Sequence, residues 1–222
     1  MIRQATYEDI PELMEIFRCA RQIMRASGNM NQWNDSYPTE EVVREDIARG
    51  VCFVLCELQH EPLPCHPQPL PCHPEPHPCH PKPHPCHPEP LPCHPERSEG
   101  SPHAHASILA TMAFIPGPDP TYARIYDGQW LDDSPYYVIH RIAVREPGHK
   151  AADRLLEWAF TQTGNIRIDT HKDNVIMHHI LQKHGFTRCG VIHLLNGAPR
   201  EAFQKNQSTT RCTQSIEHQH IK

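Results

Sequence analysis

A strand, a tight turn and a helix follow one another between residues 136 and 160, and this succession can bind a phosphate group. The first part, YYVIHRIAV, is mostly aromatic or branched and apolar, which is typical of a strand buried on both faces. Pro147 and Gly148 end the strand, and apolar residues recur at helical spacing from Ala151 onward. The first turn of a helix presents unpaired main-chain N–H groups at the positive end of the helix dipole. The sequence therefore predicts an anion-binding turn here.

Pairs of cysteine and histidine, which are ligands of zinc and copper, recur in the middle of the chain. The unit Pro-Cys-His-Pro-x-Pro-x repeats every seven residues between about residues 61 and 95. Proline at nearly every second position prevents helix and sheet, and predicts polyproline II or disorder. Adjacent Cys-His pairs on such a rod do not converge on one ion. We therefore favour a neutral repeat insertion over a metal-binding array, and we expect no metal requirement.

Charge and hydropathy exclude two classes of partner. The formal net charge is −5 and no basic run is present, so the basic surface expected for binding nucleic acid is missing. No stretch approaches the ~20 apolar residues that span a bilayer, and the N-terminus lacks a signal-peptide pattern. Five of the ten cysteines lie outside the repeat, and we expect them to be reduced thiols. These features predict a cytoplasmic protein without a nucleic-acid or membrane partner.

The rest of the chain predicts the elements that position the turn. A capping box of Thr6 and Asp9 opens the first helix, which ends near Gly28. Asn196 and Gly197 predict a type I′ hairpin between the last two strands. The remaining predicted strands are 2–5, 51–57, 107–115, 136–144 and 166–170, and the remaining helices are 40–49, a helix beginning at residue 151, and 175–184.

Aromatic residues stand out in the polar segment 29–38, between the first two predicted helices. Trp33 and Tyr37 either line an acceptor pocket or pack as a lid on the core. Trp130, in the segment before the central strand, is expected either in the core or as a wall of the pocket.

The strand-turn-helix succession resembles the acetyl-CoA-binding motif of the GNAT superfamily of N-acetyltransferases. In that family the strand ends in a hydrophobic triplet, here Ile142, Ala143 and Val144. A turn of the type Arg/Gln-x-x-Gly-x-Gly/Ala follows, and its two small-residue positions fall on Lys150 and Ala152. Alanine is an accepted variant, whereas lysine replaces the usual glycine. A lysine in a helical first-turn conformation fits there, and only a positive φ would exclude it.

The resemblance extends to residues 166–205, where a strand, an asparagine, a helix closing on Gly185–Phe186 and a last hairpin follow in the order found in GNAT proteins. With the opening IRQATYEDIPELMEIF, it covers about 1–57 and 107–205. The resemblance implies an α+β fold (three-layer α/β) with a mixed, mostly antiparallel central sheet, a parallel central pair of strands, and helices on both sides.

The same resemblance implies a single N-acetyltransferase domain over residues 1–205. We expect a disordered insert, 58–106, to interrupt this domain at a hairpin tip, and a disordered tail, 206–222, to follow it. Lengthening a hairpin loop costs only ~0.6 kcal/mol per doubling of its length, so we expect the fold to tolerate the insert.

The resemblance also implies which residues bind acetyl-CoA, the co-substrate. Besides the triplet, the set includes the turn, the start of the helix and the asparagine that holds the CoA arm. These residues are Gly148, His149, Lys150, Ala151, Ala152, Asp153 and Asn174.

For the general base, His140 is the first choice, because strand alternation places it on the face of Ile142 and Val144, just before the expected thioester carbonyl. The alternative is a structural histidine. His171 is the second choice, and Asp169 and Asp127 are weaker ones. The tyrosine that serves many GNAT proteins as the acid corresponds to Leu181, so water, His178 or His184 would replace it.

These residues predict an acetyl-CoA-dependent N-acetyltransferase that acts on an amine of a small molecule or amino acid, with Trp33, Tyr37 and Trp130 binding the acceptor. One alternative is a protein N-terminal or lysine acetyltransferase. The other is a non-catalytic acyl-CoA-binding or metal-binding protein. The sequence is compatible with a monomer or a homodimer.

Overall fold

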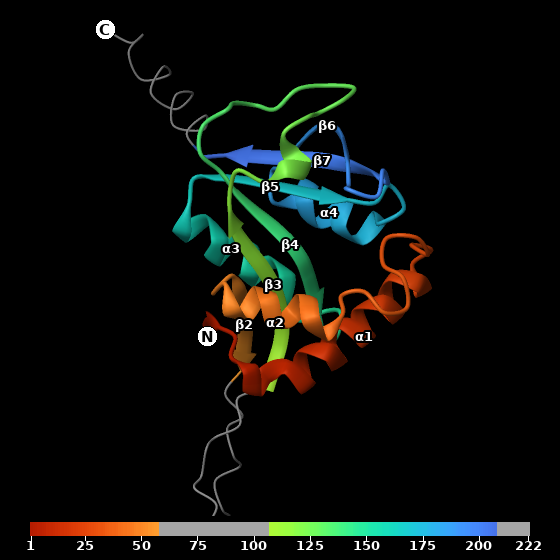
Figure 1. Ribbon diagram of the computed structural model, residues 1–222, viewed down its shortest axis with the longest axis vertical. Helices are drawn as coiled ribbons and strands as arrows, with labels where there is room; N and C mark the ends of the chain where they lie inside the picture. Colours follow the sequence, from red (N-terminus) through yellow and green to blue (C-terminus); the bar gives the residue numbers. More distant parts are fainter. Residues whose placement is uncertain (58–106, 208–222) are drawn as a thin grey trace, which may run out of the picture. The chain divides into compact units, whose positions relative to one another are not determined.

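The computed structural model describes residues 1–57 and 107–207 (Figure 1). The predicted repeat insert, and the predicted tail except for its first two residues, lie outside the described residues. The predicted domain end at 205 is slightly early, because the last strand continues to Asn206.

The described residues form a seven-stranded sheet in the order β1-β2-β3-β4-β5-β7-β6. The neighbouring strands β4 and β5 are parallel, and every other neighbouring pair is antiparallel. The strands are β1 (Ile2–Gln4), β2 (Cys52–Glu57), β3 (Ser107–Pro116), β4 (Tyr137–Val144), β5 (Asn165–Thr170), β6 (Thr187–His193) and β7 (Pro199–Asn206). This confirms the predicted mixed sheet with a parallel central pair.

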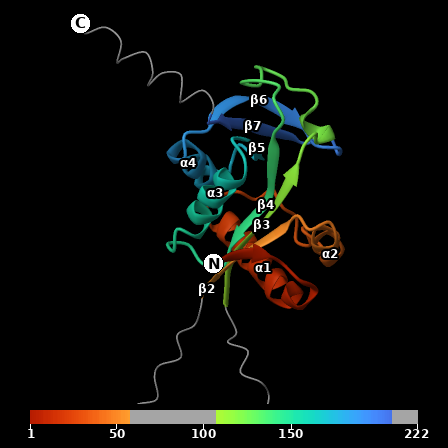
Figure 2. The ribbon, with the colours of Figure 1, turned by 90° about the vertical axis from the view of Figure 1, so that its left-hand side faces the viewer.

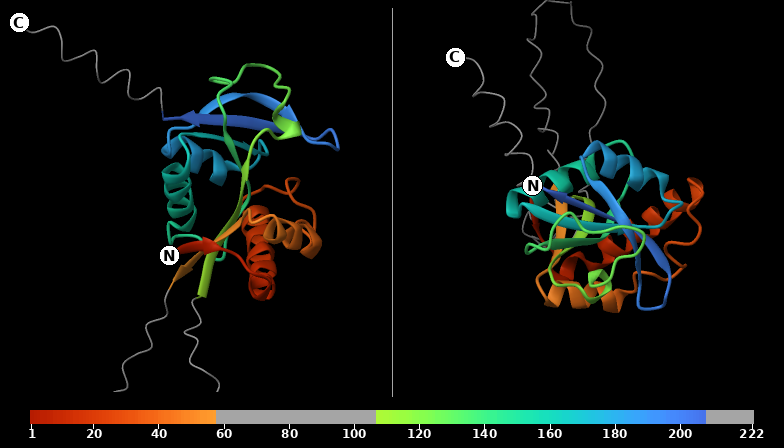
Figure 3. Two further views of the ribbon diagram at one scale, coloured as in Figure 1. Left: turned by 60° about the vertical axis from the view of Figure 1, so that its left-hand side comes forward. Right: turned by 90° about the horizontal axis from the view of Figure 1, so that it is seen from above.

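Two pairs of helices enclose the sheet. They are α1 (Ile10–Ala26), α2 (Glu40–Ala48), α3 (Ala151–Gln162) and α4 (Val175–Lys183). The pair α1 and α2 covers one face and the pair α3 and α4 the other, as Figure 2 and Figure 3 show. None of the helices in residues 1–57 and 107–207 is long and apolar enough to span a membrane.

Polar side chains fix the turn that leads into α1 and the start of α4. The Asp9 carboxylate accepts a hydrogen bond from the N–H group of Thr6, at 2.7 Å, as the capping box predicts, and a short 3-10 turn leads into α1. Asn174 accepts a hydrogen bond from the Met177 N–H group, at 3.1 Å, and thereby caps α4.

A large apolar cluster lies on each face of the sheet, and a smaller third one surrounds Tyr122. Beneath α3 and α4, the cluster includes the fully buried Leu155, Leu156 and Leu181. Beneath α1, it includes Leu13 and Ile16. Leu181 therefore fills the core, which explains why an apolar residue stands at the position where the resemblance expects a tyrosine.

β4 carries one more residue than β3 where the two strands pair. Thr111 lies opposite Ala143, and Ala113 lies opposite His140, so two residues of β4 face one residue of β3. Arg141, within this β-bulge, has a left-handed φ of 53°. Such a bulge bends the strand and increases its twist. The pairing of β4 with β5 ends at Ile139, just before the bulge, so the two strands separate there.

The bulge also corrects the predicted alternation of side chains. Ile142 and Val144 pack against the cluster beneath α3, whereas His140 contacts the ring of Tyr122 on the opposite face, with ring centroids 5.8 Å apart. The prediction that His140 shares a face with the other two residues is wrong, because the extra residue reverses the side-chain order.

A buried ion pair joins the bulge to α2. Arg141 donates from Nε and Nη2 to the two carboxylate oxygens of Asp46, at 2.8 and 2.7 Å. Only 14% and 8% of the two side chains are exposed. Arg141 also donates to the hydroxyl group of Tyr37, at 3.3 Å. The left-handed conformation of the bulge is thus held by an ion pair with strong, two-point geometry.

The predicted hairpin between the last two strands is present, but its turn type is different. A type I′ turn needs a positive φ at both central residues, and here Gly197 has one whereas Asn196 does not. The Gly197 N–H group donates to the carbonyl oxygen of Leu194, at 2.8 Å. The turn therefore places glycine at its last position, where a positive φ ends the turn.

We predict that Asp46→Asn lowers the free energy of unfolding by about 3 kcal/mol, because it leaves the Arg141 charge buried without its anion. Urea unfolding would measure this loss. Glu40→Gln, which breaks the exposed Glu40–Arg44 pair on the same helix, is the control and should cost less than about 1 kcal/mol. Equal effects of the two variants would contradict the importance of the ion pair.

Candidate active site

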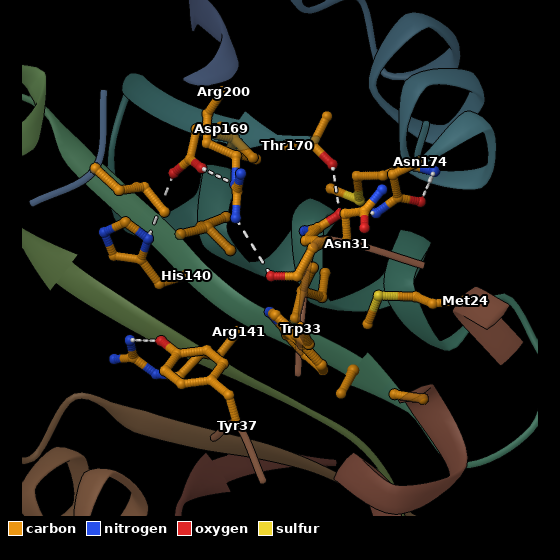
Figure 4. A pocket seen from close by; sticks show the side chains of 18 of the residues that line it. Met24, Asn31, Trp33, Tyr37, His140, Arg141, Asp169, Thr170, Asn174 and Arg200 are labelled. Atoms are coloured by element: carbon orange, nitrogen blue, oxygen red, sulfur yellow. Dashed lines mark hydrogen bonds and ion pairs between the residues drawn. The ribbon is translucent and has the colours of Figure 1, made fainter. Parts of the chain in front are cut away.

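A cavity of about 780 Å³ opens where β4 and β5 separate. Its walls come from β4, the end of β5, α4, the end of α1 and the segment that follows it, the segment between β3 and β4, and the hairpin between β6 and β7 (Figure 4). The bulged part of β4 runs through it, because residues 139–144 all line the cavity.

One part of the cavity contains half of the residues predicted to bind acetyl-CoA. Ile142, Ala143, Val144, Ala152 and Asn174 line it, together with apolar residues of α4. Within the described residues, no strand pairs with this stretch of β4 on the side of β5. A substrate arm can therefore lie beside β4 in place of a strand.

The other predicted residues surround the turn before α3. Gly148, His149 and Lys150 are exposed in this turn, and Ala151 is buried at the helix start. None of them lines the cavity. Asp153 accepts hydrogen bonds from Lys183 and His184, at 2.9 and 2.6 Å, and so joins α3 to α4. The carboxylate of Asp153 therefore has a structural role. Only the main chain of this residue can contribute to binding acetyl-CoA.

Lys150 has a φ of 51° and a ψ of 26° immediately before α3. This corrects the expectation of a helical first-turn conformation, because the position requires the left-handed region that glycine occupies most easily. A non-glycine residue there costs roughly 1–2 kcal/mol. The exposed lysine stays next to the anion-binding end of the helix, so its charge remains available to a phosphate.

His140 lies between two carboxylates. Its Nε2 atom is 3.1 Å from Oδ2 of Asp119, and its Nδ1 atom is 3.6 Å from Oδ1 of Asp169. An ionised carboxylate only accepts hydrogen bonds, and only the contact with Asp119 is short enough to be one, so the neutral ring carries its proton on Nε2 and donates a hydrogen bond to Asp119. Nδ1 then keeps its lone pair, so Asp119 orients His140 for accepting a proton at Nδ1.

Asp119 and Asp169 have further partners that fix them. Burial tends to raise the pKa of Asp119, but hydrogen bonds from His140 and Thr121 outweigh it and lower the pKa to about 2. Asp119 is therefore ionised over the whole neutral range. Asp169 accepts a hydrogen bond from the hydroxyl group of Tyr122, at 2.6 Å. Burial and the nearby carboxylate raise the pKa of Tyr122, so this hydroxyl stays protonated.

His171, the second choice for the base, does not line the cavity. Its Nδ1 atom accepts a hydrogen bond from the Asp173 N–H group, at 3.2 Å, so the lone pair is occupied. Burial and the charge of Arg200 lower the pKa of His171. Asp127 lies in an exposed turn outside the cavity. The alternative general acids are His178, in α4, and His184, at the end of that helix. Neither of them lines the cavity.

The aromatic residues predicted to bind the acceptor separate into two groups. Trp33 and Tyr37 line the cavity, with ring centroids 6.0 Å apart. Trp130 does not line it; its ring stacks on Tyr122 at 5.6 Å, and the Arg167 guanidinium lies 4.1 Å from its centroid. The expectation of Trp130 as a substrate contact is corrected, since these partners hold it in the core.

Gln32 fastens the segment between α1 and α2 to the end of β5. Its side-chain oxygen accepts hydrogen bonds from Asn174 Nδ2, at 2.8 Å, and from Asn29 Nδ2, at 2.9 Å. The Arg200 guanidinium donates to the main-chain oxygen of Gln32, at 3.2 Å. On the other side, Arg21 donates to the main-chain oxygen of Tyr37, at 3.1 Å. This segment is thus held against the cavity at both ends.

Sequence reasoning missed three residues of the site: Asp119, Arg200 and Gln32. The sequence offered one signal, since Asp119 is the acidic residue of the Pro-rich segment PGPDPT. The other two could not be found, because their positions depend on how distant segments pair. Among the described residues, no group of three or more histidine, cysteine or acidic side chains could hold a metal ion.

We predict that Lys150→Gly raises the free energy of unfolding by about 1 kcal/mol, because glycine adopts the left-handed conformation without steric cost. Thermal or urea unfolding would show the gain. Lys172→Gly is the control: this lysine is also exposed in a turn, but its φ is not positive. A gain in both variants, or in neither, would contradict the assignment of strain to Lys150.

A second prediction follows from the lowered pKa of Asp119. Asp119 has a pKa of about 2 in the folded protein and an ordinary value of 3.8, and this difference contributes about 2 kcal/mol to the free energy of unfolding. The contribution is fully present above the ordinary pKa. It is lost as the pH falls through the pKa of the folded protein. Asp119→Asn should therefore be about 2 kcal/mol less stable than the natural protein at neutral pH. The difference should shrink between about pH 4 and pH 2 in urea unfolding. Asp133→Asn, whose side chain is fully exposed, should show no such pH dependence.

Comparison with known proteins used both sequence and structure. Neither a protein-family model nor a curated protein matches the sequence. An acetyltransferase of the GNAT family from Streptococcus agalactiae is 26% identical, with a TM-score of 0.65, over 93% of this chain and 94% of that chain.

Two more distant structures share the fold. A putative acetyltransferase from Staphylococcus aureus is 17% identical, with a TM-score of 0.52, over 93% of this chain and 99% of that chain. A GNAT-family acetyltransferase from Listeria monocytogenes is 15% identical, also with a TM-score of 0.52, over 93% of this chain and 94% of that one. The likeness to the streptococcal protein, over nearly the full length of both chains, shows that this protein is an acyltransferase of the GNAT type.

Proposed function

We propose that the protein transfers the acetyl group of acetyl-CoA to the amine of a small molecule. The observation that carries this proposal is the position of His140. His140 lines the cavity with its Nδ1 atom 3.6 Å from Asp169, and it lies on β4 directly after the last residue that pairs with β5, where the stretch that can receive the CoA arm begins.

The residues around the unpaired stretch fit the pantetheine arm of acetyl-CoA. Ala143 and Ala152 are small, so main chain and ligand can approach closely, and Val144 supplies an apolar wall. The pyrophosphate would bind at the N-terminus of α3, where main-chain N–H groups and the helix dipole favour an anion. Lys150 adds a positive charge at this end.

Acetyl transfer requires a deprotonated amine. In the proposed mechanism the ammonium group binds beside Asp169 and gives a proton to Nδ1 of His140, while Asp119 holds Nε2–H and stabilises the imidazolium that forms. The amine nitrogen then attacks the thioester carbon, a main-chain N–H group of β4 stabilises the oxyanion, and the C–S bond breaks. As the bond breaks, the nitrogen loses its second proton to water and becomes the amide nitrogen. The CoA thiolate leaves and takes a proton from water, and the proton held by His140 returns to the solvent.

The held segment between α1 and α2 favours a small acceptor over a protein. A peptide would need an open groove, whereas Gln32 and Tyr37 are fastened to the body of the domain by Asn174, Arg200 and Arg21. The fit to a small amine is therefore better than the fit to a protein N-terminus or a lysine side chain.

Release of CoA thiol from acetyl-CoA in the presence of a panel of amines tests the proposal. Amine-dependent release, with the acetylated amine identified by mass spectrometry, is the expected result. Stabilisation of the protein by CoA without turnover of any amine would favour a non-catalytic acyl-CoA-binding protein instead.

We predict that His140→Ala lowers kcat/KM by ~10²-fold or more at neutral pH, the usual loss for a positioned base, and leaves CoA binding intact. The pH profile of kcat/KM should also change in the variant, because the side chain that accepts the proton is missing. His179→Ala, an exposed histidine outside the cavity, is the control.

A full rate and an unchanged pH profile in His140→Ala would refute the base assignment. If that variant does not fold, His140→Gln provides the test, because glutamine keeps a hydrogen bond to Asp119 but cannot accept the proton.

A further inference from the structure

We infer that the acceptor is a free α-amino acid, with its ammonium group at Asp169 and His140 and its carboxylate at Arg200. This inference rests on the proposed function and adds the chemical class of the acceptor. It comes from the placement of two charged side chains, Asp169 and Arg200, beside the proposed base His140 in the cavity.

Arg200 is a buried cation that points into the cavity. It lies on β7, and Figure 4 shows its guanidinium group directed past Asp169 toward the segment that carries Trp33. Only 8% of its side chain is exposed. It donates hydrogen bonds to two main-chain carbonyl oxygens, those of Pro199 at 3.0 Å and Gln32 at 3.2 Å. A guanidinium group has five N–H donors, so donors remain for a ligand.

The charge of Arg200 is only weakly compensated. Its Nε atom lies 3.8 Å from Oδ2 of Asp169, which is longer than a hydrogen bond. By contrast, Arg141 on the same cavity wall makes two short hydrogen bonds to Asp46. Burial lowers the pKa of Arg200, which reflects the cost of holding this charge away from water. A carboxylate from the ligand would supply the missing counter-charge with two-point geometry.

Asp169 supplies the complementary anion. Tyr122, a neutral donor, hydrogen-bonds its Oδ1 atom, so the carboxylate keeps its negative charge while facing Nδ1 of His140. An ammonium group placed here meets both the carboxylate that binds it and the base that deprotonates it. The amine subsite is therefore defined by the same residues that carry the proposed chemistry.

The spacing of the two subsites identifies an α-amino acid. The 3.8 Å between Arg200 and Asp169 places an anion site and a cation site next to each other, as an amine and a carboxylate on the same carbon require. A diamine or polyamine would set a second cation against Arg200 or require another free carboxylate. The other acidic residue of the wall, Asp119, is already hydrogen-bonded to His140 and Thr121. A peptide N-terminus presents an amide in place of the carboxylate and leaves Arg200 uncompensated.

The test compares matched acceptors that differ only in the carboxylate. Each amino acid is offered as the free acid and as its α-amide, with a diamine in parallel, and kcat/KM is measured by release of CoA thiol. We expect the free acids to exceed their amides by about 10- to 100-fold, the range that corresponds to charge-assisted hydrogen bonds. Equal or faster turnover of the amides or of the diamine would overturn the inference and leave acetyl transfer itself intact.

Variants of Arg200 assign the preference to this residue. In Arg200→Gln, the ratio of kcat/KM for the free acid to that for its amide should fall about 10- to 100-fold, mainly through KM for the acid. Arg200→Lys should recover part of the ratio, because it keeps the charge but loses the two-point geometry. Arg188→Gln, an exposed arginine paired with Glu201 on the neighbouring strand, is the control and should keep the ratio unchanged. An unchanged ratio in folded Arg200→Gln would contradict the assignment.

A binding measurement separates failure of this inference from failure of the proposed function. If no amine is acetylated, the proposed function fails, and calorimetric binding of the same acid and amide pairs to the CoA-loaded protein decides the inference. Preferential binding of the free acid that Arg200→Gln abolishes supports the subsite, and binding without preference refutes it. If Arg200→Gln does not fold, the acid-to-amide ratio of the natural protein decides the inference by itself.

Discussion

Arg141 and Asp46 form the ion pair on which the shape of the cavity depends. Arg141 is the residue in the bulge of β4 that has a left-handed backbone, and Asp46 holds it from α2 through two hydrogen bonds. The bulge follows directly after the last residue of β4 that pairs with β5. A bend at this point turns β4 away from its neighbour, so the sheet opens without losing its other strands. The free edge of β4 is where the proposed function places the CoA arm.

The charges in the cavity form one continuous series from Asp119 through His140 and Asp169 to Arg200. Each member constrains the next: Asp119 fixes the tautomer of His140, and Asp169 lies between the base and the cation. Because these residues come from segments far apart in the sequence, the series exists only in the folded sheet. It ends in an anion, Asp169, beside a cation, Arg200, which is the charge arrangement that the proposed zwitterionic acceptor needs.

Regular elements could be predicted from the sequence because their patterns are local. The aromatic and β-branched run at Tyr137–Val144 predicted the central strand, and the helical spacing after Ala151 predicted α3. Irregular positions could not be predicted. Strand alternation placed His140 on the wrong face, because nothing in the local sequence marks the extra residue in β4. Lys150 adopts a left-handed conformation that its residue type does not suggest. Arg200 was missed because only the pairing of β7 with β5 brings it beside Asp169.

In the proposed mechanism, the unpaired edge of β4 leads the thioester to His140. A crystal structure of the protein with CoA and an amine acceptor tests this placement without relying on kinetics. We expect the pantetheine arm to lie along residues 142–144, and the acceptor nitrogen to lie within about 3–3.5 Å of Nδ1 of His140 and of the position of the thioester carbon. CoA bound elsewhere on the domain, or an amine held out of reach of His140, would contradict the mechanism.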